Sequence, residues 1–231
     1  MNISESVKLL VEGLVYAPIY KKGASMRSGR KATGKNPLEE SWDRDFGPAD
    51  VELALKRNSD LQAIGLYTGI RGKGIVILDV DKNLRKHQKI WGDTLENAPK
   101  ITSTKANAAK FIFRVPEELW GEVKGHGLRK EDGGDYEILW GRRQGVIIGA
   151  YPGGHKSKEG HYTLTGDLST VPEAPAWLIA EMKEPPKVVT NRKDLDFTDR
   201  TEDEVQQIVY ECLSVISHQG LGSRDHWVKV G

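Results

Sequence analysis

In the stretch Gly72-Lys73-Gly74-Ile75-Val76-Ile77-Leu78-Asp79-Val80-Asp81-Lys82, a β-prone apolar run leads into two aspartates. An apolar run bounded by glycines predicts a buried strand. Strand side chains alternate between faces, so we expect Asp79 and Asp81 on one face and Val80 in the core. Paired carboxylates favour a counter-charge, and in an all-oxygen site this is usually Mg²⁺ or Mn²⁺. A solvated strand end explains the same pair equally well.

The composition excludes several classes of protein. The chain has 231 residues, 38% hydrophobic and 29% charged, which suits one large soluble domain plus a smaller piece. No apolar run approaches the roughly 18 residues of a membrane span, and Met1–Glu5 does not begin a signal peptide. We therefore expect a cytoplasmic protein with no membrane partner. The single cysteine, Cys212, excludes an internal disulfide framework and a cysteine-based zinc site.

Basic residues cluster locally, although the net charge of the chain is only +1. Between Pro18 and Leu38 there is no acid, and a flexible basic arm of this kind suits contact with phosphates. An ordinary solvated loop is the alternative interpretation. The basic positions of this segment are Lys21, Lys22, Arg27, Arg30, Lys31 and Lys35, and a second basic pair, Arg142 and Arg143, falls in a predicted turn.

Helical and strand patterns are interleaved along the chain, which predicts an α+β fold with a mixed or antiparallel sheet flanked by helices. We expect helices capped by Ser4 and by Asp50, and two further helices over 84–95 and 175–182. Two hairpins are predicted, one joining 63–67 to the Asp79 strand and one joining 135–140 to 145–150. The other expected strands cover 16–20, 101–103, 110–115 and 160–164.

The C-terminal residues indicate a second domain. A polar, proline-started linker is expected over 184–200, followed by the capping box Thr201-Glu202-Asp203-Glu204 and one apolar helical face. That face needs a partner, and too little sequence follows to supply one. We therefore expect a catalytic domain over 1–183 and the start of a small helical domain over 201–231, in a fragment of a longer polypeptide.

A third acid, Glu137, lies on a predicted strand among apolar neighbours. An acid in such a place is costly unless it is paired or bound to metal. Together with Asp79 and Asp81 it forms the grouping that two-metal phosphoryl or nucleotidyl transfer requires.

An ordered series of short motifs runs through most of the chain: Lys35-x-Pro37…Trp42, Ile64-Gly65-x-x-Thr68-Gly69, Asp79-Val80-Asp81, Thr102-Ser103, Arg114-Val115-Pro116, Glu137-Ile138-Leu139, Gln144-Gly145-Val146-Ile147-Ile148, Pro152-Gly153-Gly154-His155, Tyr162 and Pro175-x-Trp177-Leu178. In order and spacing, this series resembles the N-terminal bifunctional primase/polymerase (prim-pol) domain of the archaeo-eukaryotic primase superfamily, from about Val15 to Met182. The resemblance implies that this chain has the catalytic core of that superfamily, which includes an RRM-like part. The tail Asp225–Gly231 resembles the start of the helical domain that follows prim-pol domains in phage and plasmid replication proteins, whose longer relatives often carry a helicase.

The resemblance also implies roles for single residues. Asp79 and Asp81 match the family's first motif as metal ligands, and Glu137 matches the acid of its third motif. Where the family usually places a triphosphate-binding histidine, this chain has Lys110, and the alternative is that Lys105 or Ser103 does this work. His155 follows a turn that can reach the same site.

The sequence therefore predicts a template-dependent nucleotidyltransferase, a DNA primase, a DNA polymerase or both. The implied partners are single-stranded template, primer, nucleoside triphosphates and two Mg²⁺ or Mn²⁺ ions, in phage or plasmid replication. Lys22, Arg27, Arg30, Lys31, Lys35, Arg142 and Arg143 are the expected nucleic-acid contacts. A non-catalytic module that binds single-stranded DNA or an origin, and a metal-dependent nuclease, are the alternatives.

Overall fold

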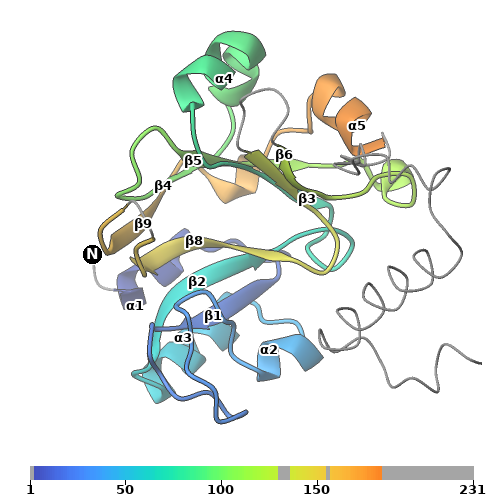
Figure 1. Cartoon of the computed structure of the whole chain (residues 1–231). Helices are drawn as coiled ribbons and strands as arrows, with labels where there is room; N and C mark the ends of the chain where they lie inside the picture. The colour runs from blue at the N-terminus through green and yellow to red at the C-terminus, as the bar shows by residue number, and fades with distance from the viewer. Residues whose placement is uncertain (1–2, 130–135, 155–156, 184–231) are drawn as a thin grey trace, which may run out of the picture. The chain divides into compact units, whose positions relative to one another are not determined.

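The computed structural model describes residues 3–129, 136–154 and 157–183, which belong to one compact unit, Met1–Pro186 (Figure 1). The predicted linker and the helical segment over 201–231 lie outside the described residues, so that division of the chain stays a prediction. No helix among the described residues is long and apolar enough to cross a bilayer.

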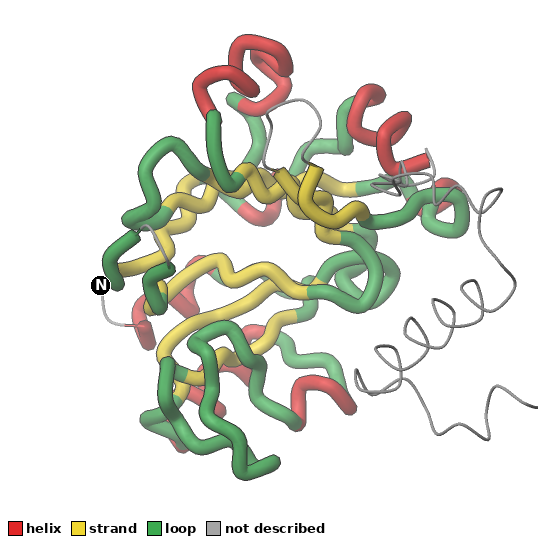
Figure 2. Tube along the Cα trace, in the orientation of Figure 1, coloured by secondary structure: helices red, strands yellow, loops and turns green. Residues whose placement is uncertain are grey.

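The described unit is α+β, as predicted, and is built on a nine-stranded sheet in the order β1-β2-β8-β9-β4-β5-β3-β7-β6. Every ladder between named strands is antiparallel. The strands are β1 Tyr16–Tyr20, β2 Leu61–Tyr67, β3 Ile75–Val80, β4 Lys100–Thr102, β5 Ala109–Arg114, β6 His126–Arg129, β7 Tyr136–Leu139, β8 Gln144–Tyr151 and β9 Gly160–Thr165. The sheet curls so that the β1–β2–β8 half faces the β5–β3–β7 half (Figure 2).

Helices cover the two outer faces of the curled sheet. In Figure 1, α4 and α5 lie over the β3 half, and α2 and α3 lie below the β2 half. The helices are α1 Ile3–Ser6, α2 Glu40–Asp43, α3 Pro48–Arg57, α4 Leu84–Trp91 and α5 Ala176–Lys183, and the 3₁₀ turns are η1 Val7–Leu9, η2 Gly92–Leu95, η3 Glu117–Leu119 and η4 Leu168–Thr170.

Two helix starts differ from the prediction. The helix expected to be capped by Ser4 begins at Ile3, so Ser4 lies inside it; this helix ends at Ser6 and continues as a 3₁₀ turn in which Val7 is buried. The helix expected to start at Asp50 begins at Pro48, because Asp50 caps it from inside the first turn and accepts the Gly47 amide hydrogen at 3.1 Å.

Both predicted hairpins are wrong. β2 pairs with β1 and β8, whereas β3 pairs with β5 and β7. The turns 68–74 and 140–143 instead carry the chain from one half of the curled sheet to the other. The two turns lie against each other, since the Thr68 amide and hydroxyl donate to the Arg143 carbonyl at 3.0 and 3.1 Å. The alternating pattern predicted extended segments correctly but does not specify their partners.

Strand β3 is buried on both faces, which explains its unbroken apolar sequence. Ile75 and Ile77 join the inner core between the two halves of the sheet. Val76, Leu78 and Val80 join a second core beneath α4 and α5. The prediction that Val80 points into the core is confirmed. The face that carries Ile75 and Ile77 is also the face that carries Asp79.

Candidate active site

The three predicted acids and one lysine lie together on the inner face of the sheet. In the strand register, Asp79 of β3 stands directly opposite Glu137 of β7 on one side and Lys110 of β5 on the other. Side chains at directly opposite positions share a face, with Cβ atoms about 4.5–5.5 Å apart. Asp81 follows two residues after Asp79, just past the end of β3. The sequence alone placed Asp79 and Asp81 on one face, and strand pairing adds Glu137 and Lys110.

Each of the three carboxylates is paired with a different basic side chain. Lys110 Nζ donates to Asp79 Oδ2, and Lys105 Nζ donates to Asp81 Oδ1. Arg143 Nη1 lies 3.8 Å from Glu137 Oε2. The Lys110–Asp79 pair is the most enclosed, with side chains 14% and 17% exposed.

The donor set suits a hard divalent cation by its chemistry, because all three candidate ligands are carboxylates. Their oxygens, however, face lysine and arginine. Within the described ranges, no group of three ligating side chains is arranged to hold a metal ion as it stands. Any metal binding by these carboxylates therefore competes with their present basic partners.

A pocket of about 150 Å³ opens beside the charged row formed by Glu137, Asp79 and Lys110. It brings together the three acids, all three candidate triphosphate ligands that the structure describes, and one lysine from the basic segment. Its lining residues are Lys35, Asp79, Val80, Asp81, Ile101, Thr102, Ser103, Lys105, Ala108, Ala109, Lys110, Glu137, Tyr151 and Tyr162. His155, the fourth candidate, lies outside the described residues.

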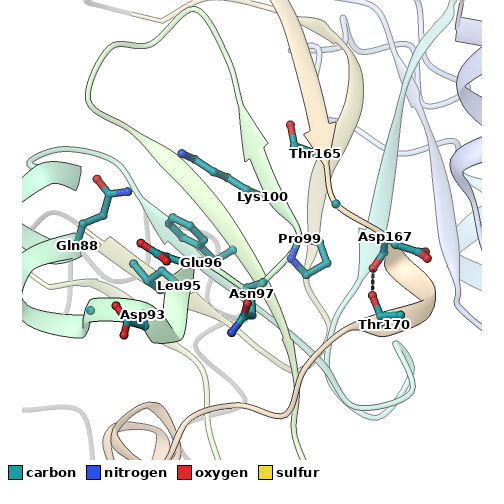
Figure 3. A pocket seen from close by; sticks show the side chains of 14 residues that line it. Gln88, Asp93, Leu95, Glu96, Asn97, Pro99, Lys100, Thr165, Asp167 and Thr170 are labelled. Carbon is teal, nitrogen blue, oxygen red and sulfur yellow. Dashed lines mark hydrogen bonds between the residues drawn. The ribbon is translucent and has the colours of Figure 1, made fainter.

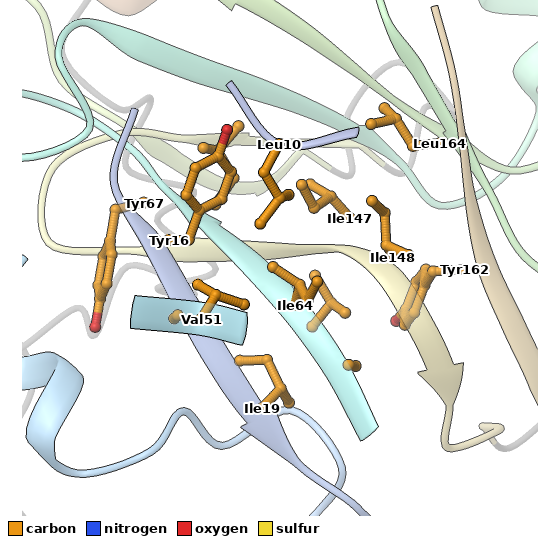
Figure 4. Packing of buried hydrophobic residues seen from close by; sticks show 14 of the residues in the cluster. Leu10, Tyr16, Ile19, Val51, Ile64, Tyr67, Ile147, Ile148, Tyr162 and Leu164 are labelled. Atoms are coloured by element: carbon orange, nitrogen blue, oxygen red, sulfur yellow. The ribbon is translucent and has the colours of Figure 1, made fainter. Parts of the chain in front are cut away.

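Two tyrosines in this pocket were not predicted as site residues. Tyr162 of β9 is buried in the inner core (Figure 4). Burial raises the pKa of its hydroxyl, and the nearby charges of Asp79 and Asp81 raise it further. Tyr151 stands edge-on to it at 5.0 Å between ring centroids. The alternation of residues 160–165 marks Tyr162 as an inward residue, but only the β8–β9–β4 pairing brings it beside the acids.

The loop that carries Lys105 is anchored on both sides of that residue. Thr104 Oγ1 donates to the Lys158 carbonyl at 2.6 Å. Asn107 accepts the Leu84 amide hydrogen with its carbonyl oxygen at 3.1 Å and the Arg85 amide hydrogen with its side chain at 3.2 Å, at the start of α4. The backbone at Lys105 is therefore held between Lys158, just before β9, and the start of α4, and its side chain reaches Asp81.

The basic segment is a hydrogen-bonded hairpin and not the flexible arm that we expected. Its strands meet at a bridge between Ser25 and Lys31, and the Met26 amide donates to the Arg30 carbonyl at 2.9 Å. Glu39 holds the hairpin to the domain by accepting from the Arg27 amide at 2.7 Å. Residues 26–30 form the tip of this hairpin.

The predicted nucleic-acid contacts occupy different places around the pocket. Arg27 and Arg30 are exposed near the hairpin tip, and Lys35 reaches the pocket. Lys22 forms a 3.1 Å ion pair with Glu159 beside β9. On the turn 140–143, Arg142 and Arg143 are both exposed, and Arg143 faces Glu137.

The larger cavity, about 430 Å³, does not contain the predicted site. It lies between η2, the start of β4 and the residues after β9 (Figure 3). The acids in its lining are Asp93, Glu96 and Asp167. Asp167 has a structural role, since it accepts the Ser169 amide hydrogen at 2.8 Å. We assign this cavity no part in the chemistry.

Residues 8–177 match the family model described as bifunctional DNA primase/polymerase, N-terminal, and this span includes the whole charged row and the pocket. No curated protein matches the chain. The family match covers more than half of the 231 residues. The chain therefore belongs to the bifunctional DNA primase/polymerase N-terminal family, which implies nucleotidyl transfer with DNA and nucleotides as substrates.

Proposed function

We propose that this chain adds nucleotides on a single-stranded DNA template at the row of Glu137, Asp79 and Lys110. The observation that supports this most is the three-strand register, which gathers acids and a lysine from β7, β3 and β5 on one face. The adjoining pocket adds Lys35 and Lys105, so candidate ligands for cations and for phosphates lie side by side.

In this proposal Asp79, Asp81 and Glu137 hold two Mg²⁺ or Mn²⁺ ions. When bound, such ions lower the pKa of an attacking 3′-hydroxyl and neutralise charge on the leaving pyrophosphate. The carboxylates orient the ions, and no side chain has to act as the base.

The triphosphate is held by basic and hydroxyl side chains of the same pocket. Lys110 and Lys105 each offer a compact charge with three donors, which suits phosphate oxygens. Ser103 lines the pocket beside them, and His155 remains a predicted contact. Tyr162 lines the pocket as a neutral side chain, and burial and the nearby acids raise the pKa of its hydroxyl above the usual value.

Template and primer are held mainly through their phosphates. The exposed hairpin residues Arg27, Arg30 and Lys31 bind the strand outside the pocket, and Lys35 and Lys22 continue toward it. Arg142 and Arg143 contact the strand from the crossing turn. Contacts of this kind are independent of sequence and fall with salt.

The family resemblance supports a setting in phage or plasmid DNA replication, in the cytoplasm of a prokaryotic host, with a helicase domain or partner in the full system. The sequences of the neighbouring genes test this setting. Neighbours without any replication function would count against it.

Incubation with a single-stranded template, labelled nucleotides and Mn²⁺, with and without a primer, tests the proposed function. We expect products longer than the input that disappear when EDTA is added. Synthesis without a primer identifies a primase, and extension alone identifies a polymerase. Degradation of the template without any triphosphate identifies a nuclease instead, and binding without any product identifies a non-catalytic module.

The affinity for the single-stranded template, measured over a range of salt concentrations, tests whether the hairpin residues contact DNA. Three lost phosphate contacts in an Arg27/Arg30/Lys31 triple alanine variant lower the slope of log affinity against log salt by about 2, at ~0.7 per contact for single strands. The charge-matched control removes Lys8, Lys56 and Arg57, which lie on η1 and α3. An unchanged slope in the hairpin variant would remove these residues from the binding surface.

A further inference from the structure

The basic partners of the acids come from separate elements that converge on one pocket. Lys110 belongs to β5, Lys105 to the loop between β4 and β5, and Arg143 to the crossing turn. Lys110 and Asp79 are mostly enclosed, so their attraction is screened less than that of a surface pair. The oxygens needed for a divalent cation are therefore engaged by ammonium groups before any cation arrives.

We propose that Lys110 and Lys105 act as exchangeable counter-ions: they hold Asp79 and Asp81 in the nucleotide-free protein and transfer to the triphosphate when it binds together with metal. This inference rests on the proposed function, because it requires these carboxylates to be the metal ligands. It adds that metal and nucleotide bind as a coupled pair.

The balance of charge in the pocket supports the coupling. Three carboxylates share the site with Lys35, Lys105, Lys110 and Arg143, so positive charges already outnumber negative ones. A divalent cation that arrives alone adds to this excess and competes with an ammonium group for the same oxygens. A triphosphate supplies new acceptors for the lysines and frees the carboxylates. Each ligand therefore raises the affinity for the other by the same factor.

The exchange requires movement of side chains only. The backbone of Lys110 is fixed in β5 between β3 and β4, and the backbone at Lys105 is held through Thr104 and Asn107. Lysine has a flexible four-carbon stem, which lets the ammonium group change partners while its Cα stays in place. The Lys105–Asp81 pair is more exposed, at 32% and 37%, so Lys110 is the stronger competitor.

Two binding measurements on Lys110→Met test this exchange without turnover. Mn²⁺ binding to the protein alone is followed by electron paramagnetic resonance, and a fluorescent deoxyadenosine triphosphate reports nucleotide affinity in Mn²⁺. We expect Mn²⁺ alone to bind about tenfold more tightly and the nucleotide about tenfold more weakly than in the unaltered chain, within the usual range of couplings. Lys105→Met gives smaller shifts in the same two directions.

Lys100→Met is the matched control, since it removes a lysine from the neighbouring strand β4 at the other cavity. It should leave both affinities unchanged. The opposite signs expected for Lys110→Met are diagnostic, because a distorted site loses affinity for both ligands. Unchanged or weaker Mn²⁺ binding in both lysine variants overturns the exchange. Mn²⁺ binding that survives Asp79→Asn unchanged contradicts the proposed metal ligands themselves, and the exchange falls with them.

Discussion

Asp79→Asn is expected to abolish template-directed nucleotide addition while the domain stays folded. Asp79 is the centre of the charged row, flanked by Glu137 and Lys110 across two strand pairs. Asparagine preserves the shape and one acceptor oxygen but removes the charge that a divalent cation requires. Loss of one preorganised electrostatic group costs roughly 10²–10³ in rate, and we expect at least that loss in primer extension.

The control for this experiment is Asp60→Asn, which removes a carboxylate paired with Lys21 at 2.6 Å outside the pocket. Exposed pairs of this kind contribute about 0–1 kcal/mol, so both its stability and its extension rate should stay close to those of the unaltered chain. Asp79→Asn leaves the Lys110 ammonium group without its carboxylate, which can lower stability. The double variant Asp79→Asn/Lys110→Met removes both charges, so its extension rate shows the loss of activity without an unpaired charge. Near-normal extension by folded Asp79→Asn, or by Asp79→Asn/Asp81→Asn, contradicts the assignment.

Gly72→Ala is expected to destabilise the domain at the first crossing turn. A Cβ atom at residue 72 would overlap the Tyr67 carbonyl oxygen and lie 2.6 Å from the Tyr67 carbonyl carbon and 2.8 Å from Thr68 Cα. All of these are backbone atoms, so no rotation of a side chain relieves the overlap. Overpacking of this kind costs about 1–3 kcal/mol, which should appear as a lower urea midpoint for unfolding.

Gly121→Ala provides the matched comparison, because a Cβ at residue 121 meets no atom within 4 Å. Its free energy of unfolding should change by no more than about 0.5 kcal/mol, as for other surface substitutions. Equal urea midpoints for the two variants would contradict the tight packing of the turn 68–74.

The local pattern of the sequence predicted several features of the site. The apolar run before Asp79 predicted β3, and the period of two placed Val80 in the core and both aspartates on one face. Glu137 stood out because it is an acid within an apolar strand. Lys110 was identified through the resemblance to the family, and the structure places it directly opposite Asp79.

Features that depend on long-range pairing were not predictable in this way. The residues of β2 and β3 look like a hairpin because a glycine-rich turn joins two apolar strands. The decisive contact is the one between Thr68 and Arg143, which are 75 positions apart and have no common local pattern. Tyr162 enters the site for a similar reason, since β9 joins the β8 ladder to the β4 ladder.

The central claim is that Asp79, Asp81 and Glu137 bind the catalytic cations. Metal-directed cleavage of the backbone tests this claim most directly. Fe²⁺ replaces Mn²⁺ in the presence of a deoxynucleoside triphosphate, and ascorbate with peroxide then cuts the backbone next to the bound iron. We predict cleavage at residues 79–81 and near residue 137, and its loss in Asp79→Asn/Asp81→Asn. Cleavage confined to other parts of the chain, or cleavage that persists in that variant, would contradict the account.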